Sequence, residues 1–136
     1  MFSHIMLGAR NLEQMGAFYD RVLAELGWQR GQTLDDGGQD DGGPRGAVWR
    51  VPGRPLPEFW IQQPWNGLPA TWGNGTQVSF LADSRDAVDR AFATAIAGGG
   101  TDEGRPGPRP AYGPAYYGAY CRDPEGNKLC FVHGMA

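Results

Sequence analysis

The chain has few cysteines, no cluster of basic residues and no long apolar run. Its 136 residues include two cysteines, and 12 lysines and arginines stand against 15 aspartates and glutamates, for a formal net charge of -3. Without a Lys/Arg cluster, the sequence lacks the electrostatic signature of nucleic-acid binding. No apolar run approaches the ~18 residues of a membrane span. We therefore expect neither a nucleic acid nor a membrane as partner.

The first residues and the cysteine content bear on the compartment. The opening "MFSHIMLG" has neither a basic region nor a small-residue cleavage site, so we do not expect a signal peptide. Two cysteines without such a peptide favour the reducing environment of the cytoplasm.

Several common functional motifs are missing too. No Gly-rich phosphate loop follows a predicted strand, and no Ser nucleophile elbow is present. The segment "DDGGQDDGG" at 35–43 is acidic, but its acids lack the alternating spacing of an EF-hand, so we expect a solvated loop there.

What is present is a strand–helix–three-strand order in the first half of the chain. Apolar residues recur at helical spacing after Asn11, a good N-cap, and Gly27 marks the end of that helix. The predicted elements are a strand at 2–7, a helix at 12–26 and strands at 28–34, 46–51 and 57–64.

The same order begins again in the second half. A strand at 76–82 precedes a helix at 85–97 whose N-cap is Ser84, and a hairpin around "DPEGN" ends the chain. The Pro- and Gly-rich segment "EGRPGPRPAYGPA" at 103–115 is predicted to be irregular.

The two halves also agree in register. His4 precedes the cap Asn11 by seven positions (4 to 11), and Gln77 precedes the cap Ser84 by seven (77 to 84). Two modules of this kind each leave an apolar sheet face uncovered, and pairing them buries both faces around a cavity. The sequence therefore predicts an α+β fold. We expect two βαβββ modules, about 1–65 and 72–136, in a curved, incomplete barrel around a central cleft.

Three segments resemble the vicinal oxygen chelate superfamily. They are "SHIMLGARNLEQMGAFYDRVLAELGW", "GNGTQVSFLADSRDAVDRAFATAIAGGG" and "YYGAYCRDPEGNKLCFV". That superfamily includes glyoxalase I, extradiol dioxygenases, fosfomycin-modifying enzymes and bleomycin-resistance proteins. The resemblance implies a single domain over 1–136, a homodimer and a small-molecule ligand or substrate.

The resemblance also implies a divalent metal (Zn, Ni, Mn or Fe) held on inward-facing strand positions. His4 lies at the first-strand ligand position, Gln77 at that of the second module and Cys130 where the last strand usually offers Glu; Gln62 falls near a fourth position. Gln is a weak neutral donor and Cys must lose a proton to bind well. We therefore expect a degenerate metal site and no tightly held metal.

Each of these groups has a simpler interpretation. His4 is equally explained as a strand histidine that bonds a backbone carbonyl, and Cys130 as a small buried residue rather than a nucleophile with His4 as its base. Strand alternation places Lys128 on the face of Cys130. A turn centred on Glu125 would pair Tyr120 with Cys130 and Cys121 with Leu129, so both cysteines are predicted to be free thiols.

The leading interpretation is a small-molecule-binding protein or enzyme of the glyoxalase/bleomycin-resistance type. Aromatic side chains with polar tips suit a pocket for a flat molecule, and Trp60, Tyr116 and Tyr120 are the candidates. Tyr116 and Tyr120 are equally explained as core residues, and Trp60 as a core or dimer contact. A binder of this type would sequester an aromatic or cationic compound. The alternatives are a metal-dependent lyase or dioxygenase that uses His4, Gln77 and Cys130, and a metal-independent enzyme in which Cys130 or a tyrosine is the acid or base.

Overall fold

The computed structural model describes residues 1–34 and 44–135. The acidic segment 35–43, expected to be a solvated loop, lies outside the described residues. The first module consists of β1 (His4–Gly8), α1 (Leu12–Ala24), β2 (Gln29–Leu34), β3 (Gly46–Arg50) and β4 (Glu58–Gln62). The second consists of β5 (Gln77–Leu81), α2 (Arg85–Ala97), β6 (Thr101–Pro108), the short 3-10 helix η1 (Pro110–Tyr112), β7 (Tyr117–Arg122) and β8 (Lys128–His133).

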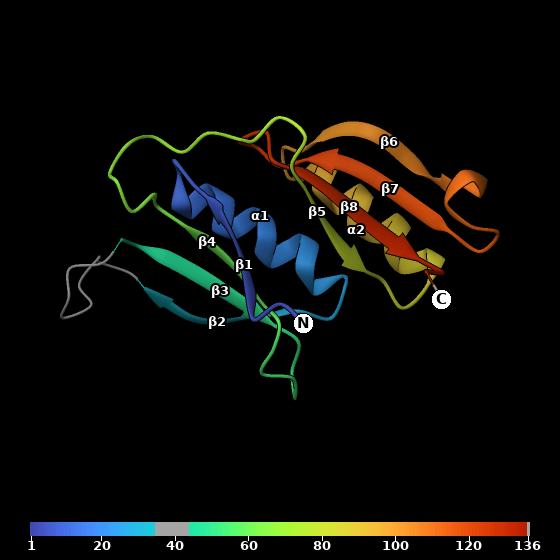
Figure 1. Cartoon of the computed structure of the whole chain (residues 1–136), viewed down its shortest axis with the longest axis horizontal. Helices are drawn as coiled ribbons and strands as arrows, with labels where there is room; N and C mark the ends of the chain where they lie inside the picture. The colour runs from blue at the N-terminus through green and yellow to red at the C-terminus, as the bar shows by residue number, and fades with distance from the viewer. Residues whose placement is uncertain (35–43, 136) are drawn as a thin grey trace.

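Each module forms its own four-stranded mixed sheet, and the predicted fold is confirmed. Sheet one has the order β1-β4-β3-β2 and sheet two has β5-β8-β7-β6. The first strand of each module lies parallel to the last, while the remaining pairs are antiparallel. The two sheets lie side by side and do not close into a barrel (Figure 1). The division at about 65 and 72 stays a prediction.

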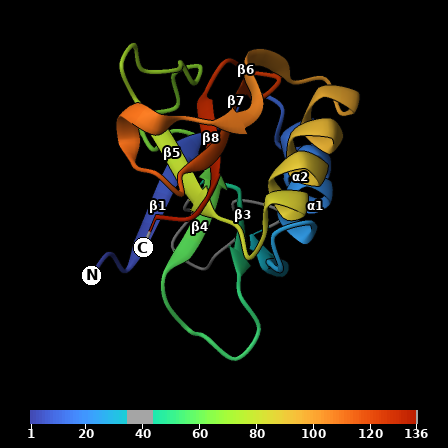
Figure 2. The same cartoon turned by 90° about the vertical axis from the view of Figure 1, so that its right-hand side faces the viewer.

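Both helices lie on one side of the molecule, against each other (Figure 2). Each begins at the predicted cap. Asn11 Oδ1 accepts a hydrogen bond from Gln14 N at 3.0 Å, and Ser84 Oγ accepts one from Ala87 N at 3.0 Å. Each helix has 13 residues. In the described part of the chain, no helix is long and apolar enough to span a membrane.

Segment 103–115, predicted to be irregular, is partly a strand, so that prediction is wrong. β6 covers Thr101–Pro108 and pairs with β7 through two register shifts. It lies at the edge of sheet two, where only one side needs hydrogen-bond partners. An edge strand therefore tolerates Pro106, Pro108 and the glycines that argued against a strand in the sequence.

The core is aromatic and continuous between the modules. The Phe59 ring on β4 lies 5.2 Å from the Phe80 ring on β5 and 4.9 Å from Tyr19 on α1, measured between centroids. All three side chains are buried. Burial of such a ring stabilises the fold by about 1.5–3 kcal/mol, and the edge-to-face contacts add to this. The modules therefore share one core on the helix side of the sheets.

The "DPEGN" turn fastens the second module to α1 of the first. Tyr19 Oη donates to Asp123 Oδ2 at 2.6 Å, and Asn127 Nδ2 donates to the same oxygen at 2.8 Å. The Glu125 carboxylate accepts from the backbone N atoms of Arg10 (2.6 Å) and Asn11 (2.8 Å), so it caps the start of α1. Burial raises the pKa of Asp123, against the opposite effect of its hydrogen bonds.

The β7–β8 hairpin has the predicted register. Tyr120 pairs with Cys130 and Cys121 with Leu129, so the two cysteines point to opposite faces of sheet two. Both are free and buried, as predicted. His133, at the end of β8, has its ring Nδ1 2.9 Å from the Ala82 carbonyl oxygen.

Candidate functional site

The predicted site residues lie on the two sheet faces that point away from the helices, here called the outer faces. Strand β5 shows the alternation: Gln77, Ser79 and Leu81 are exposed while Val78 and Phe80 are buried. On sheet one, β1 and β4 bring His4 beside Glu58, Met6 beside Trp60 and Gly8 beside Gln62. On sheet two, β5 and β8 bring Gln77 beside Lys128 and Ser79 beside Cys130.

The outer face of sheet one is centred on Glu58, a carboxylate that the sequence analysis did not single out. Glu58 Oε1 accepts from Arg50 Nε at 2.7 Å, and Glu58 Oε2 accepts from Trp60 Nε1 at 2.6 Å. The hydrogen bond from Trp60, then that from Arg50, and a smaller Coulombic effect of His4 hold the pKa of Glu58 below its usual value, against the effect of burial. The indole N–H of Trp60 is thus already used within the protein.

His4 and Gln62 flank this group. His4 is exposed, and its Nδ1 lies 3.0 Å from Ser3 Oγ. The partner found is therefore a hydroxyl and not the expected backbone carbonyl. Gln62 Nε2 donates to the Pro44 carbonyl at 3.4 Å, a long contact that holds the amide only weakly.

The outer face of sheet two is built around two tyrosines and Cys130. Tyr116 Oη lies 2.8 Å from Tyr120 Oη and 3.7 Å from Cys130 Sγ. Cys130 is 0% exposed, which fits the simple interpretation of a small buried residue. On the neighbouring strand β5, Gln77 Nε2 donates to Ser79 Oγ at 2.9 Å. Of the candidate site residues, the structure therefore brings Tyr116, Tyr120 and Cys130 together, while Trp60 lies on sheet one.

The two phenols stay protonated at neutral pH. Burial raises the pKa of Tyr116, and its hydrogen bonds with Tyr120 and Cys130 add to the effect. Burial also raises the pKa of Tyr120. One hydroxyl donates to the other, which leaves one O–H for the sulfur or for a ligand. The neutral pair can therefore offer one hydrogen-bond donor to a ligand.

A cavity of about 640 Å³ opens beside these tyrosines, within the size range of small-molecule sites. We call it the tyrosine cavity. The Tyr112 ring lies 5.2 Å from that of Tyr116 and extends the aromatic wall. The residues that line it include Gln77, Glu103, Arg109, Tyr112, Tyr116, Tyr120, Lys128 and Met135.

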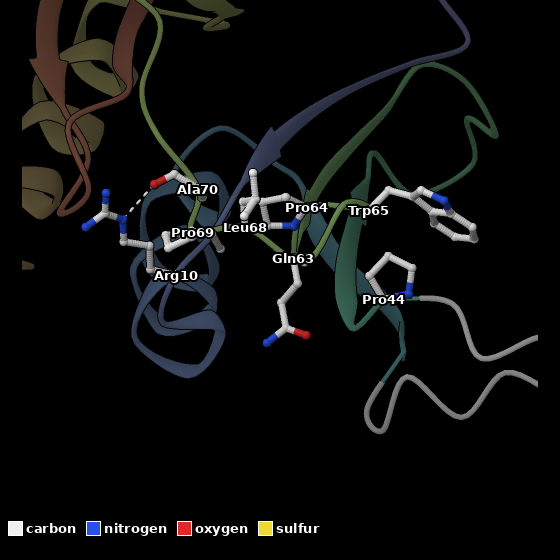
Figure 3. Close-up of a pocket in the computed structure, with 10 residues that line it drawn as sticks. Arg10, Pro44, Gln63, Pro64, Trp65, Leu68, Pro69 and Ala70 are labelled. Atoms are coloured by element: carbon white, nitrogen blue, oxygen red, sulfur yellow. Dashed lines mark hydrogen bonds between the residues drawn. The ribbon is translucent and has the colours of Figure 1, made fainter.

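A second, larger cavity of about 850 Å³ lies beyond the last residues of β1 and β4 (Figure 3). It is lined by the segment after β4, including Gln63, Trp65 and Leu68, and none of the predicted site residues lines it. Arg10 is the one charged residue among the described residues that line it. Figure 3 shows Arg10 turned toward Ala70, whose carbonyl oxygen accepts from Arg10 Nε at 2.6 Å. This cavity therefore offers little chemistry.

The three expected metal ligands lie on two separate sheets. His4 lies at the start of β1 in sheet one, whereas Gln77 and Cys130 lie on β5 and β8 in sheet two (Figure 1). Cys130 lies under the Tyr116 hydroxyl. Among residues 1–34 and 44–135, no group of three or more His, Cys, Asp and Glu side chains could hold a metal ion. Sheet two alone would offer a metal only a thiol and an amide.

Sequence reasoning missed the charged residues of both faces. Lys128 was placed on the face of Cys130 by strand alternation, and that was a usable signal for a cation in the site. Arg109 follows an edge strand that the sequence did not predict. Glu58 and Trp60 stand two apart on one strand, and this spacing puts both side chains on the same face.

Comparison with known proteins identifies the relatives of this chain. A family model described as Glyoxalase/Bleomycin resistance protein/Dioxygenase superfamily matches residues 1–131. A crystal structure of a glyoxalase/bleomycin resistance protein from Albidiferax ferrireducens T118 is 39% identical, with a TM-score of 0.82 and 98% of each chain covered. A search of proteins with curated descriptions finds no match.

More distant structures share the fold alone. A glyoxylase/bleomycin resistance protein/dioxygenase domain from Frankia sp. EAN1pec is 18% identical, with a TM-score of 0.72, and the match covers 98% of this chain and 97% of that one. Glyoxalase I from Zea mays is also 18% identical, with a TM-score of 0.69, and the match covers 96% of this chain and 44% of that one.

Proposed function

Because the chain belongs to the glyoxalase/bleomycin resistance protein/dioxygenase superfamily, we propose that it binds a small organic molecule in the tyrosine cavity. The residues proposed to contact this molecule from sheet two are Gln77, Tyr116 and Tyr120, with Cys130 beneath them. The degenerate ligand set argues for binding, or for chemistry at the tyrosines, without a tightly held metal.

The observation that carries this proposal is the arrangement of Tyr116 and Tyr120. Two half-buried phenols, 2.8 Å apart, present an aromatic wall and a hydroxyl at the edge of a cavity of about 640 Å³. A few convergent polar groups on an apolar wall are the usual features of a small-molecule site. The raised pKa of both phenols keeps them neutral, so they suit a carbonyl, carboxylate or hydroxyl oxygen as acceptor.

A second copy of the chain would complete the site from sheet one. Among the described residues, β1 and β5 each have one unpaired edge, and Met6 on β1 and Leu81 on β5 are 51% and 69% exposed. A homodimer that covers these faces would bring His4, Trp60 and Gln62 of one protomer toward Gln77 and Tyr120 of the other. Size-exclusion chromatography with light scattering tests this arrangement, and a monomer at all concentrations would contradict it.

The competing function is a divalent-metal-dependent lyase or dioxygenase with His4, Gln77 and Cys130 as ligands. It would need all three side chains around one ion and displacement of Tyr116 from Cys130. Elemental analysis of the purified protein decides between the two. Stoichiometric Zn, Ni, Mn or Fe that is lost in His4→Ala would establish the metal site.

Binding itself is tested by ligand-observed NMR with a mixture of small aromatic acids, alcohols and amines. Two variants of one strand give a matched pair. Tyr120→Ala removes the cavity wall, whereas Tyr117→Ala removes a ring on the opposite face, where Tyr117 Oη donates to Asp89 at 2.7 Å. We expect Tyr120→Ala to abolish saturation transfer and Tyr117→Ala to preserve it. Equal losses in both, or none in either, would place the ligand elsewhere.

The compartment is part of the same proposal. Two buried free thiols are compatible with the reducing cytoplasm in which we expect this protein to act.

A further inference from the structure

The charges of the tyrosine cavity are not balanced. Lys128 Nζ lies 5.5 Å and Arg109 Cζ 5.7 Å from the centroid of the Tyr120 ring. Within the part of the chain that the structure describes, no acidic side chain pairs with either cation. Glu103 also lines the cavity, but its carboxylate accepts from Arg122 Nε at 2.6 Å. Two half-buried cations therefore stand beside one tyrosine in a protein whose formal net charge is -3.

Arg109 is held in place by the backbone. Its Nη1 donates to the Pro108 carbonyl at 3.2 Å and its Nη2 to the Arg105 carbonyl at 2.7 Å. These bonds fix the guanidinium without neutralising it, and such a fixed, charged donor is well suited to a carboxylate or phosphate group. Lys128, on the neighbouring β8, supplies a second charge that is not tied to any carboxylate of the described residues.

We infer that the tyrosine cavity selects a small organic anion with a flat apolar body, such as an aromatic carboxylate. Its acid group would lie between Lys128 and Arg109 and accept from the Tyr120 or Tyr116 hydroxyl. Its ring would lie against Tyr112 and Tyr116. This inference rests on the proposed function, and it favours an anion over the cationic ligand that the sequence analysis considered.

The test compares three compounds with the same ring system: 2-naphthoate, the neutral 2-naphthalenemethanol and the cationic 2-naphthylmethylammonium. We expect 2-naphthoate to bind at least about tenfold more tightly than the alcohol, because a hydrogen bond to a charged group is worth more than a neutral one. The ammonium compound should bind most weakly. Added salt should weaken only the binding of the naphthoate.

A pair of variants assigns the preference to the cavity. Lys128→Met keeps the aliphatic stem and should weaken naphthoate binding about tenfold while leaving the alcohol unchanged. Arg21→Met, on the exposed side of α1, makes the same change in net charge away from the cavity and should leave both affinities unchanged. Lys128→Arg should restore most of the naphthoate affinity. These outcomes do not depend on catalysis or on a metal.

Lys128 also gives a direct readout, because it is the only lysine in the chain. Reductive methylation with ¹³C-formaldehyde keeps its charge and yields one lysine signal beside that of the N-terminal amine. Naphthoate should shift the lysine signal, and the N-terminal signal serves as the internal control.

The failures of the two proposals are distinguishable. If all three compounds bind equally and Tyr120→Ala abolishes this binding, the anion preference is wrong and the proposed function stands. If naphthoate binds but Lys128→Met has no effect, the acid group is held elsewhere and the inference is overturned. If none of the three binds, both proposals fail for flat aromatic ligands.

Discussion

The outer faces of the two sheets differ in how they use their charges. On sheet one, Glu58 accepts hydrogen bonds from Arg50 and Trp60, so acid, base and indole satisfy one another. On sheet two, Lys128 and Arg109 stand beside Tyr120 with no acid of the described residues paired to them. Modules with the same order of elements have thus diverged into a face with satisfied charges and a face with available ones.

This difference shows where binding free energy is available. A polar group that is already paired must lose a partner before it can bind a ligand, and that loss offsets most of the gain. The paired charges of sheet one therefore suit a structural role. The unpaired cations and the hydroxyl pair of sheet two can bind without such a loss. The repeat doubles the scaffold but does not double the site.

Asp123 joins the second module to Tyr19 of the first. Among the changes considered, Asp123→Ala should therefore cause the largest loss of stability. This change removes the acceptor of Tyr19, of Asn127 Nδ2 and of the backbone N atoms of Glu125 and Asn127. Because these donors would be left unsatisfied in a buried place, we expect a loss of about 3–5 kcal/mol in the free energy of unfolding. Urea denaturation followed by circular dichroism measures it. A loss below about 1 kcal/mol would mean that the turn does not hold the modules together.

A second change should remove the paired charges from the outer face of sheet one. Glu58→Ala deprives Arg50 and Trp60 of their acceptor, and Glu58 is only 19% exposed at its side chain. Because Arg50 is 41% exposed and water replaces part of the bond, we expect a loss of about 1–2 kcal/mol. Urea denaturation of the variant and of the wild-type protein measures this loss.

Glu103 is the acid of sheet two that can be compared with Glu58 of sheet one. Glu103 and Arg122 form an ion pair whose side chains are 35% and 28% exposed. We expect Glu103→Ala to cost less than about 1 kcal/mol. It should also tighten the binding of an anion, since it removes the negative charge that lines the cavity. A loss as large as that of Glu58→Ala would remove the distinction between the faces.

The sequence predicted the fold better than it predicted the site, for physical reasons. Periodicity, two N-caps and turn residues are local signals, and they located both helices and the register of the β7–β8 hairpin. The pairing of Glu58 with Arg50 and the lack of a described acidic partner for Lys128 depend on which strands become neighbours. Strand β6 was not predicted because its prolines argue against a strand, and its position at the sheet edge, where proline is tolerated, is not visible in the sequence. The separation of His4 from Gln77 within one chain depends on how whole modules pack.

Removal of one tyrosine hydroxyl from the outer face of sheet two should have a small effect on stability. Tyr116→Phe keeps the ring and loses a hydroxyl whose partners are another hydroxyl and a thiol, a weak acceptor. We expect a change of no more than about 1 kcal/mol, with a clear loss of affinity for an anion. Parallel measurement of unfolding and binding tests this prediction. A large loss of stability with unchanged binding would show that Tyr116 only packs over Cys130.

The smallest effect concerns pH and the buried Asp123. Burial raises its pKa in the folded protein, so its contribution to stability is fully present below the unfolded pKa of about 3.9 and is lost as pH rises through the folded pKa. Asp123→Asn cannot titrate, and its amide oxygen can still accept from the backbone N atoms of Glu125 and Asn127. The wild-type protein should therefore exceed this variant in stability more at about pH 4 than at about pH 7. Urea denaturation of both proteins at the two pH values gives the comparison. A gap that widens toward neutral pH would mean that the hydrogen bonds from Tyr19 and Asn127 outweigh burial and hold Asp123 as a carboxylate.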